Sequence, residues 1–196
     1  MFVKLRGRRC LVVGGGRVAG SKIEGLLHCG AVVRVVAPEV TREIMSWNDN
    51  KWLTWVARGF QSSDLEDVHL VVAATGSRRV NDAVFRAADA RRILCNTVDE
   101  PERCHFYYPA VVRRGDLQIA ISTGGLSPAL AKSLRSELES YIGPEYGAWV
   151  ERLGAIRKRL LARPMDASRR SRILHRLADR RPSTGPSAED SPEDAS

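Results

Sequence analysis

The sequence predicts an α/β protein, in which a doubly wound parallel sheet is followed by a small β-hairpin and a helical region. Three observations favour this class. An apolar run over residues 11–13 stops abruptly at Gly14, Gly15 and Gly16, and helical spacing follows. Short apolar segments then alternate with helical ones as far as residue 98, which implies parallel strands joined by right-handed crossovers. After Asp99 the pattern changes to two strands around a turn, and then to helices.

Periodicity and turn residues place the elements in order. Strands are expected over 11–13, 32–36, 52–56, 70–74 and 93–98, and helices over 18–28, 41–47 and 79–90. Strands over 106–112 and 117–122 should form the hairpin around a turn at 113–116, before helices over 128–141, 145–161 and 165–180. We therefore predict a Rossmann-type domain over 1–112, a hairpin region over 113–144, a helical domain over 145–181 and a disordered tail over 182–196, which is rich in Ser, Pro and acids.

The glycine-rich turn has the pattern G-x-G-x-x-A between a buried strand and a helix. Gly14 permits the tight turn, Gly16 lets backbone N–H groups approach a pyrophosphate, and Ala19 lets the helix pack closely on the strand. The helix N-terminus adds unpaired N–H donors, and the backbone of Arg17 and Val18 should lie over the cofactor phosphates. The turn predicts a dinucleotide site; the alternative is a glycine-rich turn without a ligand.

The carboxyl ends of the other strands supply further candidates, because ligands of such sheets bind at that edge. The usual fingerprint ends its second strand with an acid that holds the adenosine ribose, whereas here Pro38 stands in that place and Glu39 follows late. Thr75 and Gly76 end the fourth strand, and they either border the cofactor or only turn the chain into the next helix.

Asp99 directly follows the fifth predicted strand at the same edge. A carboxylate there can accept a proton from a substrate as hydride leaves it. The residues alone favour the other interpretation, an aspartate that caps the turn into Glu100-Pro101, because aspartate is common in turns.

A second loop, Thr123-Gly124-Gly125-Leu126-Ser127-Pro128, precedes a helix in which Ser127 suits the N-cap. Glycines beside a helix N-terminus form a donor-rich concavity that binds carboxylates. Lys132, about a turn along the helix, adds positive charge or lies on a solvated face.

Charge and composition set the remaining limits. The formal net charge is +8, and residues 150–181 carry eleven Lys or Arg against three acids, which suits a nucleic acid, a small polyanion or a solvated helix face. The chain shows neither a bilayer-length apolar run nor a signal peptide, and its four cysteines lack metal-ligand spacing, so we expect a cytoplasmic protein with reduced thiols and without a bound structural metal.

Several motifs together resemble the dehydrogenase domain of siroheme synthases, the precorrin-2 dehydrogenase family. They are Leu5-x-Gly7-x-x-Cys10-Leu11-Val12-Val13-Gly14-Gly15-Gly16-x-Val18-Ala19, Val36-Ala37-Pro38-Glu39, Asp64-Leu65, Val72-Ala73-Ala74-Thr75 with Asn81, Asn96-x-Val98-Asp99, Cys104-x-Phe106-x-x-Pro109-Ala110 and Ile121-Ser122-Thr123-Gly124-Gly125-x-Ser127-Pro128-x-Leu130-Ala131. The resemblance covers about residues 1–142, and its most family-specific part is residues 124–131.

This resemblance implies NAD-dependent oxidation of precorrin-2 to sirohydrochlorin, with ferrous iron insertion as a second activity of some members. It assigns the catalytic role to Asp99. The implied cofactor contacts are Gly14, Gly15, Gly16, Arg17, Val18, Pro38, Glu39, Thr75 and Gly76, and the implied substrate contacts are Thr123, Gly124, Gly125, Ser127 and Lys132. It further implies an intertwined homodimer held by the 113–144 region, and a partner protein that supplies precorrin-2.

Two other classes of function stay open at the sequence level. One is a non-catalytic NAD-sensing module, and the other is a nucleic-acid-binding protein that uses the basic 150–181 segment. We expect neither a nucleic-acid nor a membrane partner for the dehydrogenase. His105 either assists iron during chelation or is structural.

Overall fold

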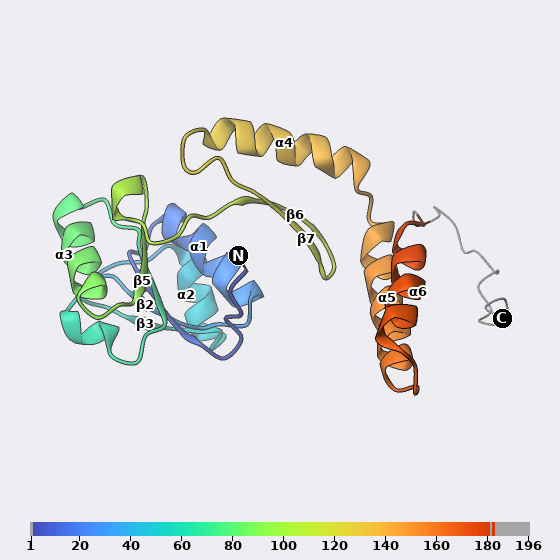
Figure 1. The fold of residues 1–196 in the computed structure, drawn as a ribbon. Helices are drawn as coiled ribbons and strands as arrows, with labels where there is room; N and C mark the ends of the chain where they lie inside the picture. Colours follow the sequence, from blue (N-terminus) through green and yellow to red (C-terminus); the bar gives the residue numbers. More distant parts are fainter. Residues whose placement is uncertain (1, 181, 183–196) are drawn as a thin grey trace. The chain divides into compact units, whose positions relative to one another are not determined.

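The computed structural model describes residues 2–180 and 182 (Figure 1). The chain divides into two compact units, Met1–Tyr107 and Tyr108–Ser196, and each is described by itself. The predicted tail over 182–196 lies, except for Pro182, outside the described residues.

The first unit contains a five-stranded parallel sheet. Its strands are β1 (Arg9–Val13), β2 (Val32–Val36), β3 (Leu53–Val56), β4 (Leu70–Ala73) and β5 (Leu94–Thr97), in the order β3-β2-β1-β4-β5. From β1 the chain adds β2 and β3 on one side and then β4 and β5 on the other, so the strand order switches between β1 and β4. Sheets of this topology bind their ligands at that switch point. The predicted fold class is confirmed.

Helices cover both faces of this sheet. One face packs against α1 (Arg17–His28) and α2 (Arg42–Asp49), with Ile23 and Ile44 fully buried in the same apolar cluster as Val12. The other face packs against α3 (Arg78–Asp89) and the 3₁₀ helix η1 (Ser62–Leu65) through a separate apolar cluster. Figure 1 shows α3 on one side of the sheet and α1 and α2 on the other. The sheet is therefore buried on both faces, which explains its nearly continuous apolar strands.

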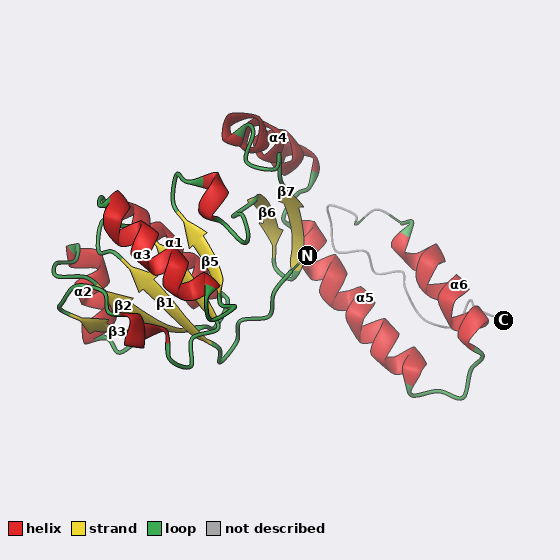
Figure 2. Cartoon of the chain, turned by 60° about the vertical axis from the view of Figure 1, so that its left-hand side comes forward, coloured by secondary structure: helices red, strands yellow, loops and turns green. Residues whose placement is uncertain are grey.

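The second unit begins with an antiparallel hairpin, β6 (Ala110–Arg114) and β7 (Leu117–Ile121), followed by α4 (Pro128–Tyr141), α5 (Glu145–Leu161) and α6 (Ala167–Ala178). The side chain of Arg114 donates to the carbonyls of Glu139 and Ile142 and so ties the hairpin to the end of α4. A Cβ at Gly147 would meet the Arg114 carbonyl at 3.2 Å, so α5 packs directly on the hairpin turn. Figures 1 and 2 both show α5 and α6 side by side.

The hairpin differs from its prediction. We expected the first strand over 106–112, but β6 begins at Ala110 because Pro109 lacks the N–H that ladder pairing needs. The expected four-residue turn is a two-residue turn, since Arg114 pairs with Leu117 and Gly115 adopts φ +57°. Before β6, the short 3₁₀ helix η2 (Pro101–Arg103) leads into a bridge between Asn96 and Cys104.

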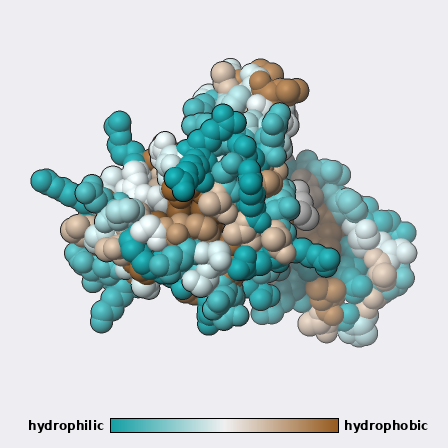
Figure 3. Space-filling view, turned by 90° about the vertical axis from the view of Figure 1, so that its left-hand side faces the viewer, coloured by the Kyte–Doolittle hydropathy of each residue, from teal (hydrophilic) through white to brown (hydrophobic). Residues whose placement is uncertain are grey.

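In the described part of the chain, the helices are all too short or too polar to cross a bilayer. On the face seen in Figure 3, hydrophilic side chains predominate and apolar ones occur in small groups.

Candidate active site

The first two glycines of the turn are required by the protein itself. Gly14 adopts φ +123°, and a Cβ there would lie 2.3 Å from the backbone oxygen of Ala74. A Cβ at Gly15 would lie 2.0 Å from the backbone oxygen of Glu39, and the Thr41 N–H donates to the Gly15 carbonyl at 2.9 Å. The turn after β1 thus packs directly against the loops that follow β2 and β4, with no room for a side chain at Gly14 or Gly15.

Gly16 has a different environment. It is the N-cap of α1 with φ −81°, a conformation open to any residue, and a Cβ there would meet no atom of the described chain within 4 Å. Among the described residues no side chain caps this helix. The N–H groups of the first turn, beside the exposed Arg17 and half-exposed Val18, are therefore available to an anion. This open, uncapped cradle fits a dinucleotide pyrophosphate.

The loop after β4 is held by Asn81, a buried side chain on α3. Its Oδ1 accepts from the Thr75 N–H at 3.2 Å and from the Thr75 hydroxyl at 2.7 Å, and its Nδ2 donates to the Thr75 carbonyl. The Thr75 hydroxyl is therefore engaged by Asn81, while Gly76 is exposed and open. We had not assigned Asn81 a structural role, although an amide in the apolar stripe with Val84 and Ala88 is a signal for one.

Asp99 lies at the same edge of the sheet. The Val98 N–H donates to the Ala73 carbonyl at 2.9 Å, as the Ala74 N–H does to Val13, so both loops start level with the glycine turn. Asp99 is exposed and adopts φ +61°, a left-handed conformation that is rare for residues other than glycine. Lys51, Asp67 and Arg92 adopt the same conformation, so it places Asp99 on a turn at the carboxyl edge of β5 and does not by itself indicate a function.

The loops after β2 and β3 form the opposite end of this edge. Pro38 and Glu39 are exposed there, and the indole N–H of Trp55 fixes the Ala37 carbonyl at 2.9 Å. Arg58, two residues beyond β3, forms a bidentate pair with Asp64 at 2.8 and 2.7 Å.

Asp64 is 4% exposed and also accepts the Gln61 N–H at 2.8 Å. The hydrogen bonds from Arg58, first, and from the Gln61 N–H hold the pKa of Asp64 below its ordinary value. The carboxylate thus anchors η1 and orients Arg58.

The loop before α4 belongs to the second unit. Gly124 and Gly125 adopt φ +63° and +85°, the Ser127 N–H donates to the Thr123 hydroxyl, and the Leu130 N–H donates to the Ser127 hydroxyl. Ser127 is thus the N-cap, as predicted, and both hydroxyls shape the loop. Lys132 is exposed farther along α4.

His105 is held at both ring nitrogens. Its Nδ1 accepts the Cys95 N–H at 3.1 Å, so its Nε2 carries the proton and donates to Asp89 at 3.2 Å. The ring also packs on Phe85, with centroids 5.2 Å apart. Cys95 is at the start of β5 and Asp89 ends α3, so His105 lies away from the carboxyl edge and fastens the segment after η2 to the sheet. Within residues 2–180 and 182, no group of three or more His, Cys, Asp or Glu could hold a metal ion.

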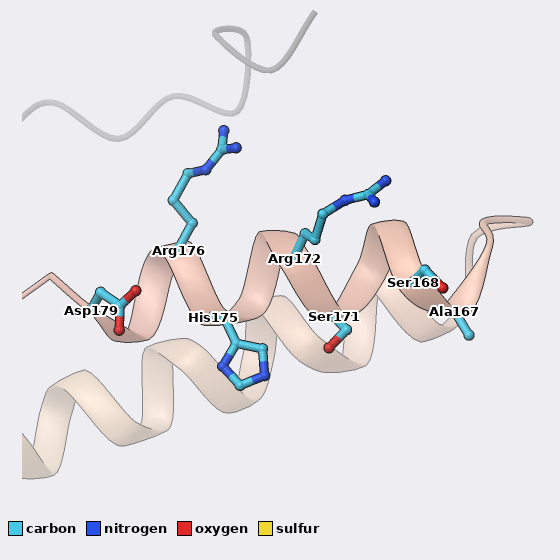
Figure 4. A pocket seen from close by; sticks show the side chains of 7 residues that line it. All are labelled: Ala167, Ser168, Ser171, Arg172, His175, Arg176 and Asp179. Atoms are coloured by element: carbon cyan, nitrogen blue, oxygen red, sulfur yellow. The ribbon is translucent and has the colours of Figure 1, made fainter.

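A hollow of about 710 Å³ runs along α6 in the second unit. In Figure 4, Arg172 and Arg176 extend from one side of the helix and His175 from the other. Because these side chains diverge, the hollow offers no converging set of groups for a ligand.

The fold and the uncapped glycine turn define a dinucleotide-binding protein of the Rossmann class. A family profile described as "Putative NAD(P)-binding" matches residues 1–110, and one described as "Sirohaem biosynthesis protein central" matches residues 114–141. The chain belongs to the family formed by precorrin-2 dehydrogenases and the N-terminal part of siroheme synthases.

Relatives agree with this assignment. The chain is 40% identical over 151 residues to a siroheme synthase of Actinobacillus pleuropneumoniae, covering 77% of this chain and 31% of that protein. It is 38% identical over 177 residues to siroheme synthase 2 of Pectobacterium atrosepticum, covering 90% of this chain and 39% of that protein. The chain thus spans roughly a third of the length of these curated relatives. A solved structure described as SirC, precorrin-2 dehydrogenase, aligns with a TM-score of 0.77 at 32% identity, over 91% of this chain and 88% of that one.

Proposed function

We propose that this chain oxidises precorrin-2 to sirohydrochlorin with NAD. The observation that carries the proposal is the position of Asp99, on a left-handed loop at the same sheet edge as the glycine turn. The reaction removes two electrons and a proton as hydride, and a second proton must be accepted by a base. A carboxylate at the nicotinamide end of the crevice suits that second task.

In this proposal, the residues at the carboxyl edge of the sheet bind the cofactor and accept a proton. NAD, when bound, supplies the hydride acceptor. The uncapped backbone N–H groups of Arg17 and Val18 bind its pyrophosphate. Gly16 leaves the space beside them open, which a side chain at that position would fill. Thr75, fixed by Asn81, and Gly76 border the cofactor, and Asp99 receives the proton from the macrocycle.

NAD is favoured over NADP by the groups at the ends of β2 and β3. Glu39 is exposed there and can bond ribose hydroxyls, whereas it would repel a 2′-phosphate. Arg58 lies in the adjoining loop, but its bidentate pair with Asp64 occupies both terminal nitrogens. A 2′-phosphate would therefore have to compete with a buried carboxylate for this arginine.

The second unit supplies substrate contacts and the dimer in this proposal. Precorrin-2 carries carboxylate side chains, and the loop Thr123, Gly124, Gly125, Ser127 together with Lys132 offers donors and positive charge to them. Leu126, Leu130 and Leu134 are 92%, 50% and 38% exposed, and burying them against a second copy removes this apolar surface from water.

We propose iron insertion as a second activity from the family resemblance alone, with ferrous iron as a substrate.

The four cysteines are free thiols, two of them buried, as suits an enzyme of the cytoplasm.

The test is a turnover assay with the purified full chain, NAD and precorrin-2. We expect sirohydrochlorin and reduced nicotinamide to appear in equal amounts, and the same assay with ferrous iron separates chelation from oxidation. An NAD-sensing module would bind the cofactor without turnover. A nucleic-acid-binding protein would shift DNA in a salt-dependent way and leave precorrin-2 unchanged.

A further inference from the structure

Arg103 is a charged side chain beside the candidate site that the roles above do not use. It ends η2, the short 3₁₀ helix that follows the turn bearing Asp99. Its Nε lies 2.6 Å from the Asp82 carboxylate of α3, and its Nη1 donates to the Glu100 carboxylate. The side chains of Arg103 and Asp82 are each 27% exposed and that of Glu100 is 19% exposed, so water and salt screen these two pairs less than a surface pair.

Asp99 lies in a tight turn between β5 and η2. The Glu100 N–H donates to the Thr97 carbonyl at 3.3 Å and closes a four-residue turn, in which Asp99 is the third residue. The Cys104 thiol lies 3.2 and 3.3 Å from the carbonyl oxygens of Thr97 and Glu100, so it supports both ends of this turn. Arg103 then connects the Glu100 end of the turn to α3.

The beginning of α3 anchors a second loop of the site as well. Asn81, next to Asp82, holds Thr75 of the loop after β4 through three hydrogen bonds. Asp82 holds the segment after Asp99 through Arg103. Adjacent side chains of one helix therefore support the loop that we propose to border the cofactor and the turn that bears the proposed base.

Two other arginines approach the same carboxylates from the surface. Arg86 lies 3.4 Å from Asp82, and Arg78 lies 3.8 Å from Glu100, with side chains 79% and 80% exposed. In the described part of the chain, Arg103 alone pairs with both carboxylates. It is thus the ionic link between α3 and η2, and Arg86 is a matched control for it.

We propose that Arg103 is a positioning residue, whose guanidinium braces the turn bearing Asp99 against α3. Without this cation, the carboxylates of Asp82 and Glu100 would repel each other, because both lie against the same guanidinium. The turn would then be held less firmly, and its carboxylate would meet the substrate in the reactive geometry less often. This role rests on the proposed dehydrogenase function, whereas the brace itself does not.

Amide hydrogen exchange, followed by NMR on the full chain, tests the brace without turnover. The Glu100 N–H closes the turn, whereas the Val98 N–H donates to a carbonyl of β4. In Arg103→Met we expect exchange at Glu100 to be about fivefold faster or more, and exchange at Val98 to change less than about twofold, because the turn loosens and the sheet does not. Arg86→Met should change neither rate. Unchanged exchange at Glu100 in Arg103→Met overturns the proposal.

A double-mutant cycle on turnover tests the positioning role. Arg103→Met should lower kcat about tenfold and change KM for NAD less than about twofold, whereas Arg86→Met should keep the wild-type kcat. In the Asp99→Asn background, Arg103→Met should change the remaining rate less than about twofold, because Arg103 acts through Asp99. A tenfold loss in both backgrounds would mean that Arg103 acts independently, and would contradict the proposal.

Two further outcomes are distinguishable. If Arg103→Met does not fold, Asp82→Asn removes the α3 end of the brace instead, and it should likewise speed exchange at Glu100 and lower kcat. Unchanged values in Asp82→Asn would overturn the proposal. If hydrogen exchange shows the brace but the wild type does not oxidise precorrin-2, the proposed function fails and the brace stands.

Discussion

Asp64 shows how one side chain connects the fold of the first unit to its acid stability. It is nearly fully buried, and Arg58 and the Gln61 N–H stabilise its charged form. The pKa of Asp64 is therefore lower in the folded protein than its ordinary value of 3.8. Because the folded pKa is depressed, this contribution to stability is fully present above pH 3.8 and is lost as the pH falls through the folded value.

Replacing Asp64 by Asn should therefore make the free energy of unfolding depend less on pH in the acid range. Arg58 is 38% exposed, so screening limits the pair, and we expect Asp64→Asn to reduce the free energy of unfolding by about 1–2 kcal/mol at pH 7. The difference from wild type should shrink below pH 3.8. Denaturant titrations across this range measure both effects. Asp67→Asn, at an exposed ion pair, should change stability by less than about 0.5 kcal/mol, and an equal acid dependence in Asp64→Asn and wild type would contradict the assignment.

At the scale of the element, the turn between β1 and α1 contains two kinds of glycine. Gly14 and Gly15 are needed for the fold, whereas we expect Gly16 to be needed for cofactor binding. Gly15 has a neighbouring loop against its Cα, whereas Gly16 faces open space. Gly15→Ala should therefore destabilise the protein by about 2 kcal/mol or more, since the backbone at Glu39 and Val40 must move.

Gly16→Ala should instead lower the melting temperature by only a few degrees, because its φ is accessible to alanine and the less favourable N-cap residue costs about 1 kcal/mol. It should weaken NADH binding about tenfold or more, because the added methyl group occupies the place of the pyrophosphate. Fluorescence titration of NADH and thermal unfolding separate the two variants. Unchanged NADH affinity in a folded Gly16→Ala protein would remove the glycine turn from the cofactor site.

The sequence predicts an element well when the residues that determine it lie within a few positions of one another. The strand–glycine–helix unit and the Ser127 cap were predicted because their signals lie within a few residues. The hairpin was placed too early because a β-prone run outweighed Pro109, whose missing N–H decides the start of β6. The role of Asn81 depends on how the first turn of α3 packs against the loop after β4, which periodicity does not reveal.

The candidate site shows the same division. That the loops after β1, β4 and β5 meet at one edge followed from parallel topology and was predicted. That the Thr75 hydroxyl is engaged by Asn81, and that His105 is tied to Cys95 and Asp89 away from this edge, required coordinates. The assignments of individual residues to cofactor and substrate stay predictions.

At the scale of the whole molecule, the exposed leucines of the second unit predict a homodimer. Leu130 and Leu134 lie one turn apart on α4, half-exposed and exposed by more than a third, respectively. Light scattering should give twice the chain mass of 21.7 kDa at micromolar concentration. Leu130→Glu with Leu134→Glu should shift the protein to monomer, whereas Leu161→Glu on α5 should not. A monomeric wild type would contradict the prediction.

The central claim is that Asp99 performs the proton transfer in the oxidation of precorrin-2, and one comparison tests it most directly. Asp67 offers a matched control, because it is an exposed aspartate with φ +59°, close to the +61° of Asp99, but it lies before β4 at the opposite edge of the sheet. We predict that Asp99→Asn lowers kcat for sirohydrochlorin formation about 100-fold or more with NADH binding retained, while Asp67→Asn keeps the wild-type rate. Equal rates in wild type and a folded Asp99→Asn protein would contradict the account.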